Sequence, residues 1–238
     1  MSNASANGLP DDGFPATPRW SAWYGPSAAA VAVLASLAVY RRLPPVLATH
    51  WTLDGVPDGW SARPAAAFGT PAMMLGLWAL LRAAPALDPR RANYAKFGGA
   101  RDVIANAAVT LLLVMHGATL AAALGRPVPV ARLGFCALGL FLAAVGNVLP
   151  RVRPNLFIGV RTPWTLSSDA AWARTHRLAG HLFAGAGVAV ALGALVLPPA
   201  VTGAVVLAAA AAGVVVPTAY SYVAWAREAR AARDCRRL

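Results

Sequence analysis

Long runs without charged residues alternate along this chain with short polar segments. A helix of about twenty residues crosses a hydrocarbon core of ~30 Å. Pro198 and Pro199 divide the last run into two spans, because neither residue donates a helical hydrogen bond. The pattern therefore predicts an all-α integral membrane protein, a bundle of about six transmembrane helices. The uncharged runs cover residues 21–40, 64–81, 103–125, 133–150 and 178–226.

Composition agrees with this prediction. Hydrophobic residues make up 58% of the 238 residues and charged residues only 13%, whereas about a quarter of a soluble domain is charged. The net charge of +12 could indicate nucleic-acid binding. However, lysine is almost absent, and the arginines border the apolar runs, which is typical of charges that set topology and meet lipid headgroups. We therefore expect membrane lipids as partners and no direct binding of nucleic acid.

The distribution of Lys and Arg predicts the orientation. Sixteen of the 21 lie in the N-terminal tail, the segment between the second and third runs, the segment 150–177 and the C-terminus. The positive-inside rule places these four regions, and so both termini, in the cytoplasm. The segment 41–63 then faces outward, although Arg41 and Arg42 lie on this translocated side against the trend.

The segment 150–177 concentrates five arginines and two tryptophans between two apolar runs. Pro150, Pro154 and Pro163 exclude one continuous helix. We expect Ser167 or Ser168 to cap the next helix, with a favourable negative charge at Asp169 in its first turn. The arginines either contact lipid phosphates, with Trp164 and Trp172 in the membrane interface, or present forked donors to an acidic partner.

This part of the chain resembles a known family. From Asn147 it reads N-x-L-P-x-V-R-P-N-x-F-I-G-V-R-T-P-W-T-L-S-S-D-x-x-W-x-R-T-H-R-L-A-G. This is similar to the signature of the SdpI family, bacterial multi-pass membrane proteins named for a toxin-immunity protein. Upstream, residues 43–60, LPPVLATHWTLDGVPDGW, resemble a domain of unknown function that accompanies this family.

The resemblance implies a function and a location. It implies immunity to a secreted peptide toxin that acts on the membrane, in the bacterial plasma (inner) membrane. It also implies a signalling role, in which a small soluble repressor is sequestered at the membrane. Predicted partner-binding residues of the signature are Asn147, Pro150, Arg151, Arg153, Pro154, Asn155, Gly159, Arg161, Thr162, Pro163, Trp164, Ser167, Ser168, Trp172, Thr175, His176 and Arg177, and those of outward recognition are Pro45, His50, Trp51, Gly55, Pro57, Asp58, Gly59 and Trp60.

Four regions follow from these patterns. Residues 1–20 are predicted to be a disordered polar tail and residues 227–238 a basic cytoplasmic tail. Residues 21–101 form the N-terminal membrane domain of unknown function with its outward loop 41–63. Residues 102–226 form the SdpI-like membrane domain with its cytoplasmic loop 150–177.

Two histidines each have more than one possible role. His116 is a candidate intramembrane polar site, with Asn106 and Thr110 nearby; it either makes one interhelical hydrogen bond or lines a path with Asn147. His176 either senses pH beside Arg174 and Arg177 or, more simply, contacts headgroups. Asn147 and Asn155 are expected to tie down the backbone around the prolines. The path through His116 belongs to an alternative function, a transporter or channel that exports a toxic solute.

No catalytic motif is present in the sequence, so we expect no enzyme activity and no cofactor. The outward loop has strong turn signals at Asp54-Gly55 and at residues 57–59, with Trp51 and Trp60 as headgroup anchors. A metal site built from His50, Asp54 and Asp58 is a weaker alternative, because the spacing lacks the density of known sites. Recognition of a partner is the preferred interpretation of this loop.

Overall fold

The computed structural model describes residues 19–235. Most of the predicted tail, residues 1–18, and the last three residues of the predicted basic tail lie outside the described residues. Six of the helices are long and apolar enough to cross a membrane, as predicted. The elements are α1 (Arg19–Val39), η1 (Tyr40–Arg42), β1 (Val46–Trp51), β2 (Pro57–Ala62), α2 (Arg63–Leu87), η2 (Arg91–Lys96), α3 (Gly98–Ala123), α4 (Val130–Val148), η3 (Leu149–Arg151), α5 (Pro163–Ser167), α6 (Asp169–Val196) and α7 (Pro199–Cys235).

Several helices extend past the uncharged runs. Helix α2 continues beyond Arg82 to Leu87, and α3 begins before Arg101 and Asp102. Helix α7 has 37 residues and includes residues 227–235, so the described part of the predicted basic tail is helical. Charged residues are therefore held inside the helices at one end of the bundle, where they have partners described below.

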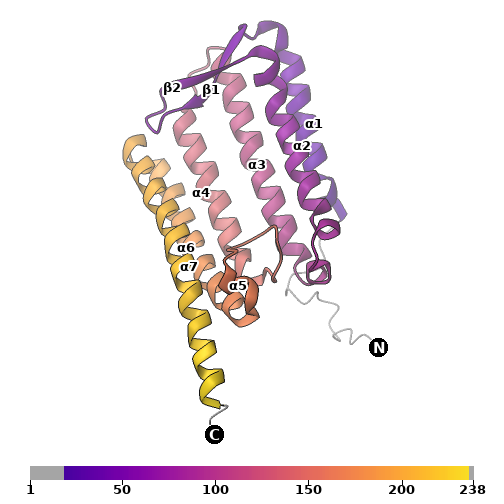
Figure 1. Ribbon diagram of the computed structural model, residues 1–238. Helices are drawn as coiled ribbons and strands as arrows, with labels where there is room; N and C mark the ends of the chain where they lie inside the picture. Colours follow the sequence, from indigo (N-terminus) through magenta and orange to yellow (C-terminus); the bar gives the residue numbers. More distant parts are fainter. Residues whose placement is uncertain (1–18, 236–238) are drawn as a thin grey trace.

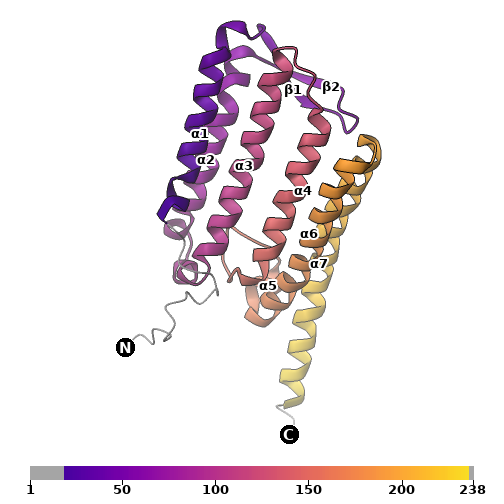
Figure 2. The same ribbon diagram turned by 180° about the vertical axis from the view of Figure 1, so that it is seen from behind.

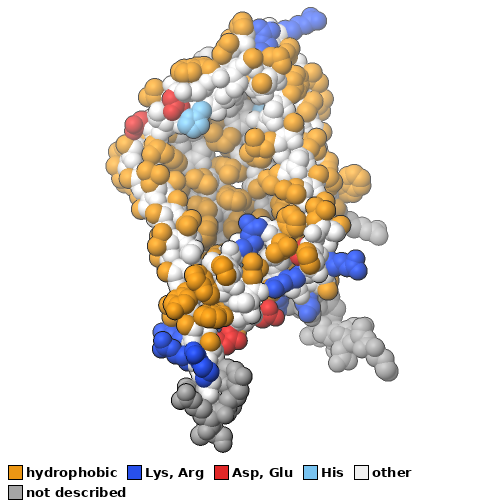
Figure 3. Space-filling view, in the orientation of Figure 1, with side chains coloured by type: hydrophobic (Ala, Val, Ile, Leu, Met, Phe, Trp, Pro, Cys, Tyr) orange, Lys and Arg blue, Asp and Glu red, His pale blue; other side chains and the backbone are white. Residues whose placement is uncertain are grey.

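The helices form two groups that meet along α3 and α4. Figures 1 and 2 show α1, α2 and α3 side by side on one flank and α4, α6 and α7 on the other. Both termini of the described chain, η2 and α5 lie at one end, which we call the arginine-rich end. The β1–β2 hairpin lies at the opposite end. In Figure 3, Lys and Arg side chains gather at the arginine-rich end, and hydrophobic side chains cover much of the bundle between the ends.

The predicted outward loop is an antiparallel hairpin. Val46 pairs with Ala62, and the strands are joined by a turn in which Gly55 has a φ of 83°, a conformation that favours glycine. The turn predicted at Asp54-Gly55 is confirmed, but the one predicted at residues 57–59 is wrong because these residues form β2. Leu47 is buried against the bundle and anchors the hairpin there.

Helices α4 and α6 approach closely through small residues. A Cβ on Gly146 would lie 2.2 Å from the backbone nitrogen of Ala184, and one on Gly187 would lie 2.3 Å from that of Ala143. Between membrane spans such contacts provide van der Waals packing that side chains would otherwise prevent. The first half of α6, which includes the end of the segment 150–177, is thereby held against the end of α4.

Candidate functional site

The segment 150–177, which we call the signature segment, is folded onto the connection between α2 and α3. Asp88 is buried there, 3% exposed. Its carboxylate accepts hydrogen bonds from the Leu156 amide at 2.7 Å, the Arg90 amide at 2.8 Å and the Tyr94 hydroxyl at 2.8 Å. Asn93 adds a hydrogen bond from its amide to the Pro154 carbonyl at 2.8 Å. The connection between α2 and α3 therefore holds the irregular backbone of the signature segment in place through these hydrogen bonds.

These contacts shift the pKa of both acidic groups. Burial alone would raise the pKa of Asp88, but the amides of Leu156 and Arg90, the Tyr94 hydroxyl and the Arg90 charge outweigh it. The net effect holds the pKa of Asp88 below its ordinary value. Burial, and then the hydrogen bond to Asp88, raises the pKa of Tyr94 above its ordinary range. At neutral pH the pair is thus an ionised carboxylate and a neutral phenol.

Asn155 organises the turn of the signature segment from within. Its side chain is fully buried, donates to the carbonyls of Arg153 and Ile158 at 2.8 and 2.9 Å, and accepts from the amides of Phe157 and Ile158. The expected structural role of Asn155 is confirmed. A side chain that satisfies four backbone groups defines one backbone path.

His176 and Trp172 fix the segment onto α6. The His176 Nε2 accepts from the Val160 amide at 3.0 Å, so Nδ1 carries the hydrogen and donates to the Trp172 carbonyl at 2.9 Å. The two rings stack at 4.0 Å between centroids, and the Trp172 indole donates to the Val152 carbonyl at 2.7 Å. His176 and Trp172 are 0% and 1% exposed. The predicted headgroup contact of His176 is therefore wrong, and the Trp172 ring packs within the protein.

The helix starts are capped from within the segment. Ser168 accepts from the Ala171 amide at 3.0 Å and caps α6, with Asp169 in the first turn, as predicted. Thr162 caps the short helix α5, which the sequence analysis did not predict. Thr162 also bonds Ser221 at 2.9 Å, and Ser168 donates to Glu228, so α7 holds the other side of the segment.

The predicted partner-binding residues of the signature divide by exposure. Arg151 and Arg161 also donate to backbone carbonyls, of Asn147 and Leu156 respectively. A buried side chain cannot touch a partner, so only part of the predicted set is available for recognition. The exposed ones are Asn147, Arg153, Arg161, Pro163, Ser167 and Arg177; the half-buried ones are Pro150, Arg151, Gly159, Trp164 and Ser168; the buried ones are Pro154, Asn155, Thr162, Trp172, Thr175 and His176.

The hairpin end carries a second candidate site. His50 Nδ1 lies 2.5 Å from a carboxylate oxygen of Asp58, and both side chains remain exposed. Within residues 19–235, no three side chains of the types that ligate metals converge. Beneath β1 lies an apolar recess of about 360 Å³, which we call the hairpin recess. Its lining includes Trp51, Leu53, Leu112, Met115, Gly134 and Phe135, and Figure 3 shows the surface hollowed below the hairpin.

Comparison with known proteins agrees with both halves of this architecture. Residues 151–221 match the SdpI/YfhL protein family, and residues 28–75 match a domain of unknown function, DUF1648. The chain is 25% identical over 159 residues to the immunity protein SdpI of Bacillus subtilis (strain 168), covering 67% of this chain and 74% of that protein. No solved structure matches the chain significantly.

The SdpI/YfhL match extends from Arg151 through the signature segment and α6 into α7. The DUF1648 match covers most of α1, the hairpin and the first half of α2. The family resemblance expected from the sequence is therefore confirmed. The chain is an all-α multi-pass membrane protein that is similar to an immunity protein of Bacillus subtilis.

The sequence patterns did not identify all of the residues that hold the signature segment in place. Asp88, Arg90, Asn93 and Tyr94 were not predicted as site residues. Asp88 directly follows α2. The available signal was an acid followed by proline, a turn pattern, in a connection otherwise rich in cations.

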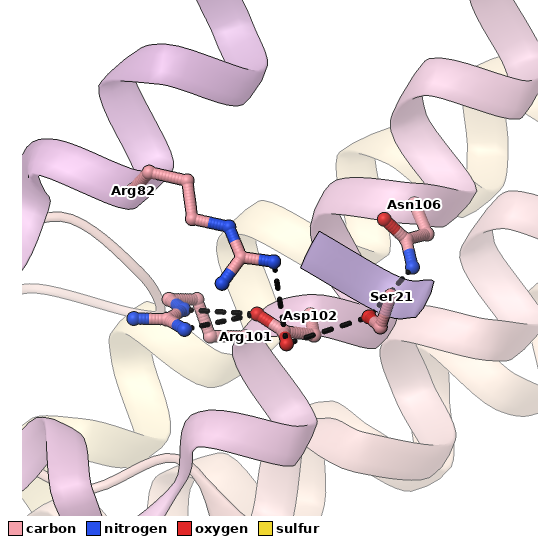
Figure 4. Close-up of polar contacts among 5 residues, drawn as sticks. All are labelled: Ser21, Arg82, Arg101, Asp102 and Asn106. Atoms are coloured by element: carbon pink, nitrogen blue, oxygen red, sulfur yellow. Dashed lines mark hydrogen bonds and ion pairs between the residues drawn. The ribbon is translucent and has the colours of Figure 1, made fainter. Parts of the chain in front are cut away.

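Asp102 joins three helices in a half-buried polar cluster (Figure 4). Arg101 donates to its carboxylate at 3.0 and 3.1 Å, Arg82 from α2 lies 3.6 Å away, and Ser21 from α1 donates at 3.4 Å. Asn106 donates to Ser21 at 3.1 Å. Arg82 and Arg101, counted above as connection residues, are thus partners of a buried acid.

His116 forms a hydrogen bond with Ser36 on α1, whereas a transport path would bring it together with Asn147. The Ser36 hydroxyl donates to the Ala67 carbonyl at 2.6 Å, so it accepts from His116 Nε2 at 2.9 Å. This confirms the interhelical hydrogen bond. Asn106 and Thr110 bond Ser21 and Tyr24 on α1 rather than His116. His116 is buried and Asn147 is exposed on another helix, so the structure does not bring this pair together.

Proposed function

We propose that this chain protects a bacterial cell against a secreted, membrane-active peptide toxin by capturing the peptide at the hairpin end. The similarity to an immunity protein over 67% of the chain carries this proposal. The distribution of Lys and Arg supports an outward orientation of the hairpin end, where a secreted toxin would meet the protein first.

The hairpin recess suits such a ligand. Its lining is almost entirely apolar, and it lies between β1, α3 and α4. Leu53, Val56 and Trp60 leave further apolar surface exposed on the hairpin. A membrane-active peptide has an apolar face, and pockets of this kind take apolar groups while a few polar groups at the rim set orientation. His50 and Asp58 supply polar groups on β1 and β2.

Filling the hairpin recess tests the proposal. Gly134 lines the recess, and a Cβ there would lie 3.3 Å from the Met115 sulfur. Gly134→Leu adds volume where the peptide is expected to bind. A toxin-sensitive strain that expresses the wild-type chain should survive exposure to the toxin, and the variant should lose at least about tenfold of that protection, equivalent to ~1.4 kcal/mol of binding.

The matched control is Gly76→Leu, because Gly76 is exposed on α2 with no atom within 4 Å of a Cβ. Both variants must reach the membrane in equal amounts. Full protection by Gly134→Leu would remove the hairpin recess from the mechanism. Failure of the wild type against every membrane-active peptide tested would remove immunity itself and favour export of a solute.

A second role, the holding of a small soluble repressor, is favoured by the exposed arginines of α6. Arg174 and Arg177 lie one turn apart on this helix and are exposed. Guanidinium groups in this arrangement suit an acidic protein surface. Replacement of both by Gln should abolish recruitment of the repressor to membranes while leaving insertion intact. Recruitment that survives this change would leave these arginines as lipid contacts only.

A further inference from the structure

A polar recess of about 360 Å³ lies at the arginine-rich end, formed by η2, the signature segment and the first turn of α6. We call it the signature recess. Its walls are held by hydrogen bonds already described, from Asn93 to the Pro154 carbonyl and from the Trp172 indole to the Val152 carbonyl. The lining that matters here is Asn93, Lys96, Arg153, Asp169 and Trp172. The backbone walls of the recess are therefore preformed.

Charges of both signs line this recess without pairing. Lys96, Arg153 and Asp169 are all exposed. The ion pairs among the described residues involve other groups, so neither cation lies within 4.0 Å of the Asp169 carboxylate. Their side chains also make no hydrogen bond within residues 19–235. Two cations and one anion thus stand apart around one cavity.

The position of the recess at the ends of the membrane spans indicates that its ligand is a lipid headgroup. Its residues come from the connection between the spans α2 and α3, from the end of the fourth span and the residues just after it, and from the start of the fifth span. These are the positions where a spanning helix passes from hydrocarbon to the headgroup layer. Basic pockets at this level are typical binding sites of phospholipid headgroups.

We propose that the signature recess binds the headgroup of a zwitterionic phospholipid that carries a primary amine. The phosphate lies beside Lys96 and Arg153, which donate charge-assisted hydrogen bonds, and the ammonium donates to Asp169. A trimethylammonium group has no hydrogen to donate, and a glycerol headgroup has no positive charge. Free phosphate offers Asp169 no ammonium group to pair with.

Native mass spectrometry of the purified full chain tests this proposal. The protein is released from vesicles of ethanolamine, choline or glycerol phospholipids with identical acyl chains, and the retained lipids are counted. We expect the ethanolamine lipid to be retained about tenfold more than the other two. Asp169→Asn should abolish this preference. Lys96→Gln with Arg153→Gln should abolish retention of the ethanolamine lipid.

Two controls keep the result specific. Arg42→Gln removes an exposed cation at the hairpin end and should change nothing. Asp169→Glu retains the charge and should retain the preference, which separates ligand binding from damage to the start of α6. Equal retention of the three lipids by the wild type would overturn the proposal. Displacement of the lipid by inorganic phosphate as readily as by phosphoethanolamine would also overturn it, because the site would then be one for free phosphate.

Discussion

A single carboxylate, Asp88, carries much of the order of the signature segment. It accepts from Leu156, which lies 68 residues further along the chain, and from Tyr94. Asp88→Asn keeps the size but turns one acceptor into a donor that faces amide and hydroxyl hydrogens. We expect the free energy of unfolding at pH 7 to fall by about 2 kcal/mol, the usual contribution of hydrogen bonds to a buried charge. Thermal unfolding in detergent measures the change.

The contribution of Asp88 to the free energy of unfolding depends on pH because the pKa of its carboxyl group is lowered. Because the folded value lies below the unfolded one, the contribution of Asp88 is fully present above about pH 4 and is lost as the pH falls below it. The difference between wild type and Asp88→Asn should therefore shrink in acid. The control is Asp54→Asn at the exposed hairpin turn. A difference that stays constant down to pH 3 would contradict the assigned ionisation.

At the scale of elements, the contact between α4 and α6 positions the signature segment. Gly146→Ala places a Cβ 2.2 Å from the Ala184 backbone nitrogen, so the two helices must separate. Overpacking of this kind costs about 1–3 kcal/mol, and we expect a corresponding fall in thermal stability. Gly185→Ala is the control on α6, because nothing lies within 4 Å of its Cβ, and it should be neutral or slightly stabilising. Equal effects of the two substitutions would show that this contact does not hold the helices together.

At the scale of the whole molecule, the orientation in the membrane is open to a direct test. Both ends of the described chain and the signature segment lie at the arginine-rich end, and the hairpin lies opposite (Figure 1). After replacement of Cys136 and Cys235 by serine, single cysteines are introduced at two exposed positions, Asp54→Cys and Ser167→Cys. An impermeant maleimide should label the first in intact cells and the second only after permeabilisation. The reverse pattern would invert the topology and place the hairpin recess in the cytoplasm.

The sequence by itself determined the features that depend on local chemistry. Five apolar runs, the last divided at Pro198 and Pro199, predict six spans because lipid requires each backbone group to be satisfied within its own helix. The division at Pro198 and Pro199, the Ser168 cap and the turn at Gly55 follow from the same short-range rules and are confirmed. The family resemblance follows from contiguous residues of the signature, which can be recognised without knowledge of the tertiary structure.

Only the tertiary structure decided which polar groups meet. Asp88 and Leu156, or Ser21 and Asp102, lie far apart in sequence, so their contact depends on how whole helices pack. For the same reason, the sequence suggested exposed roles for His176 and Trp172, whereas packing buries them. Their burial follows because η2, α6 and α7 surround a backbone whose amides and carbonyls must be satisfied away from water. A linear pattern of residues contains the donors and acceptors but not this pairing.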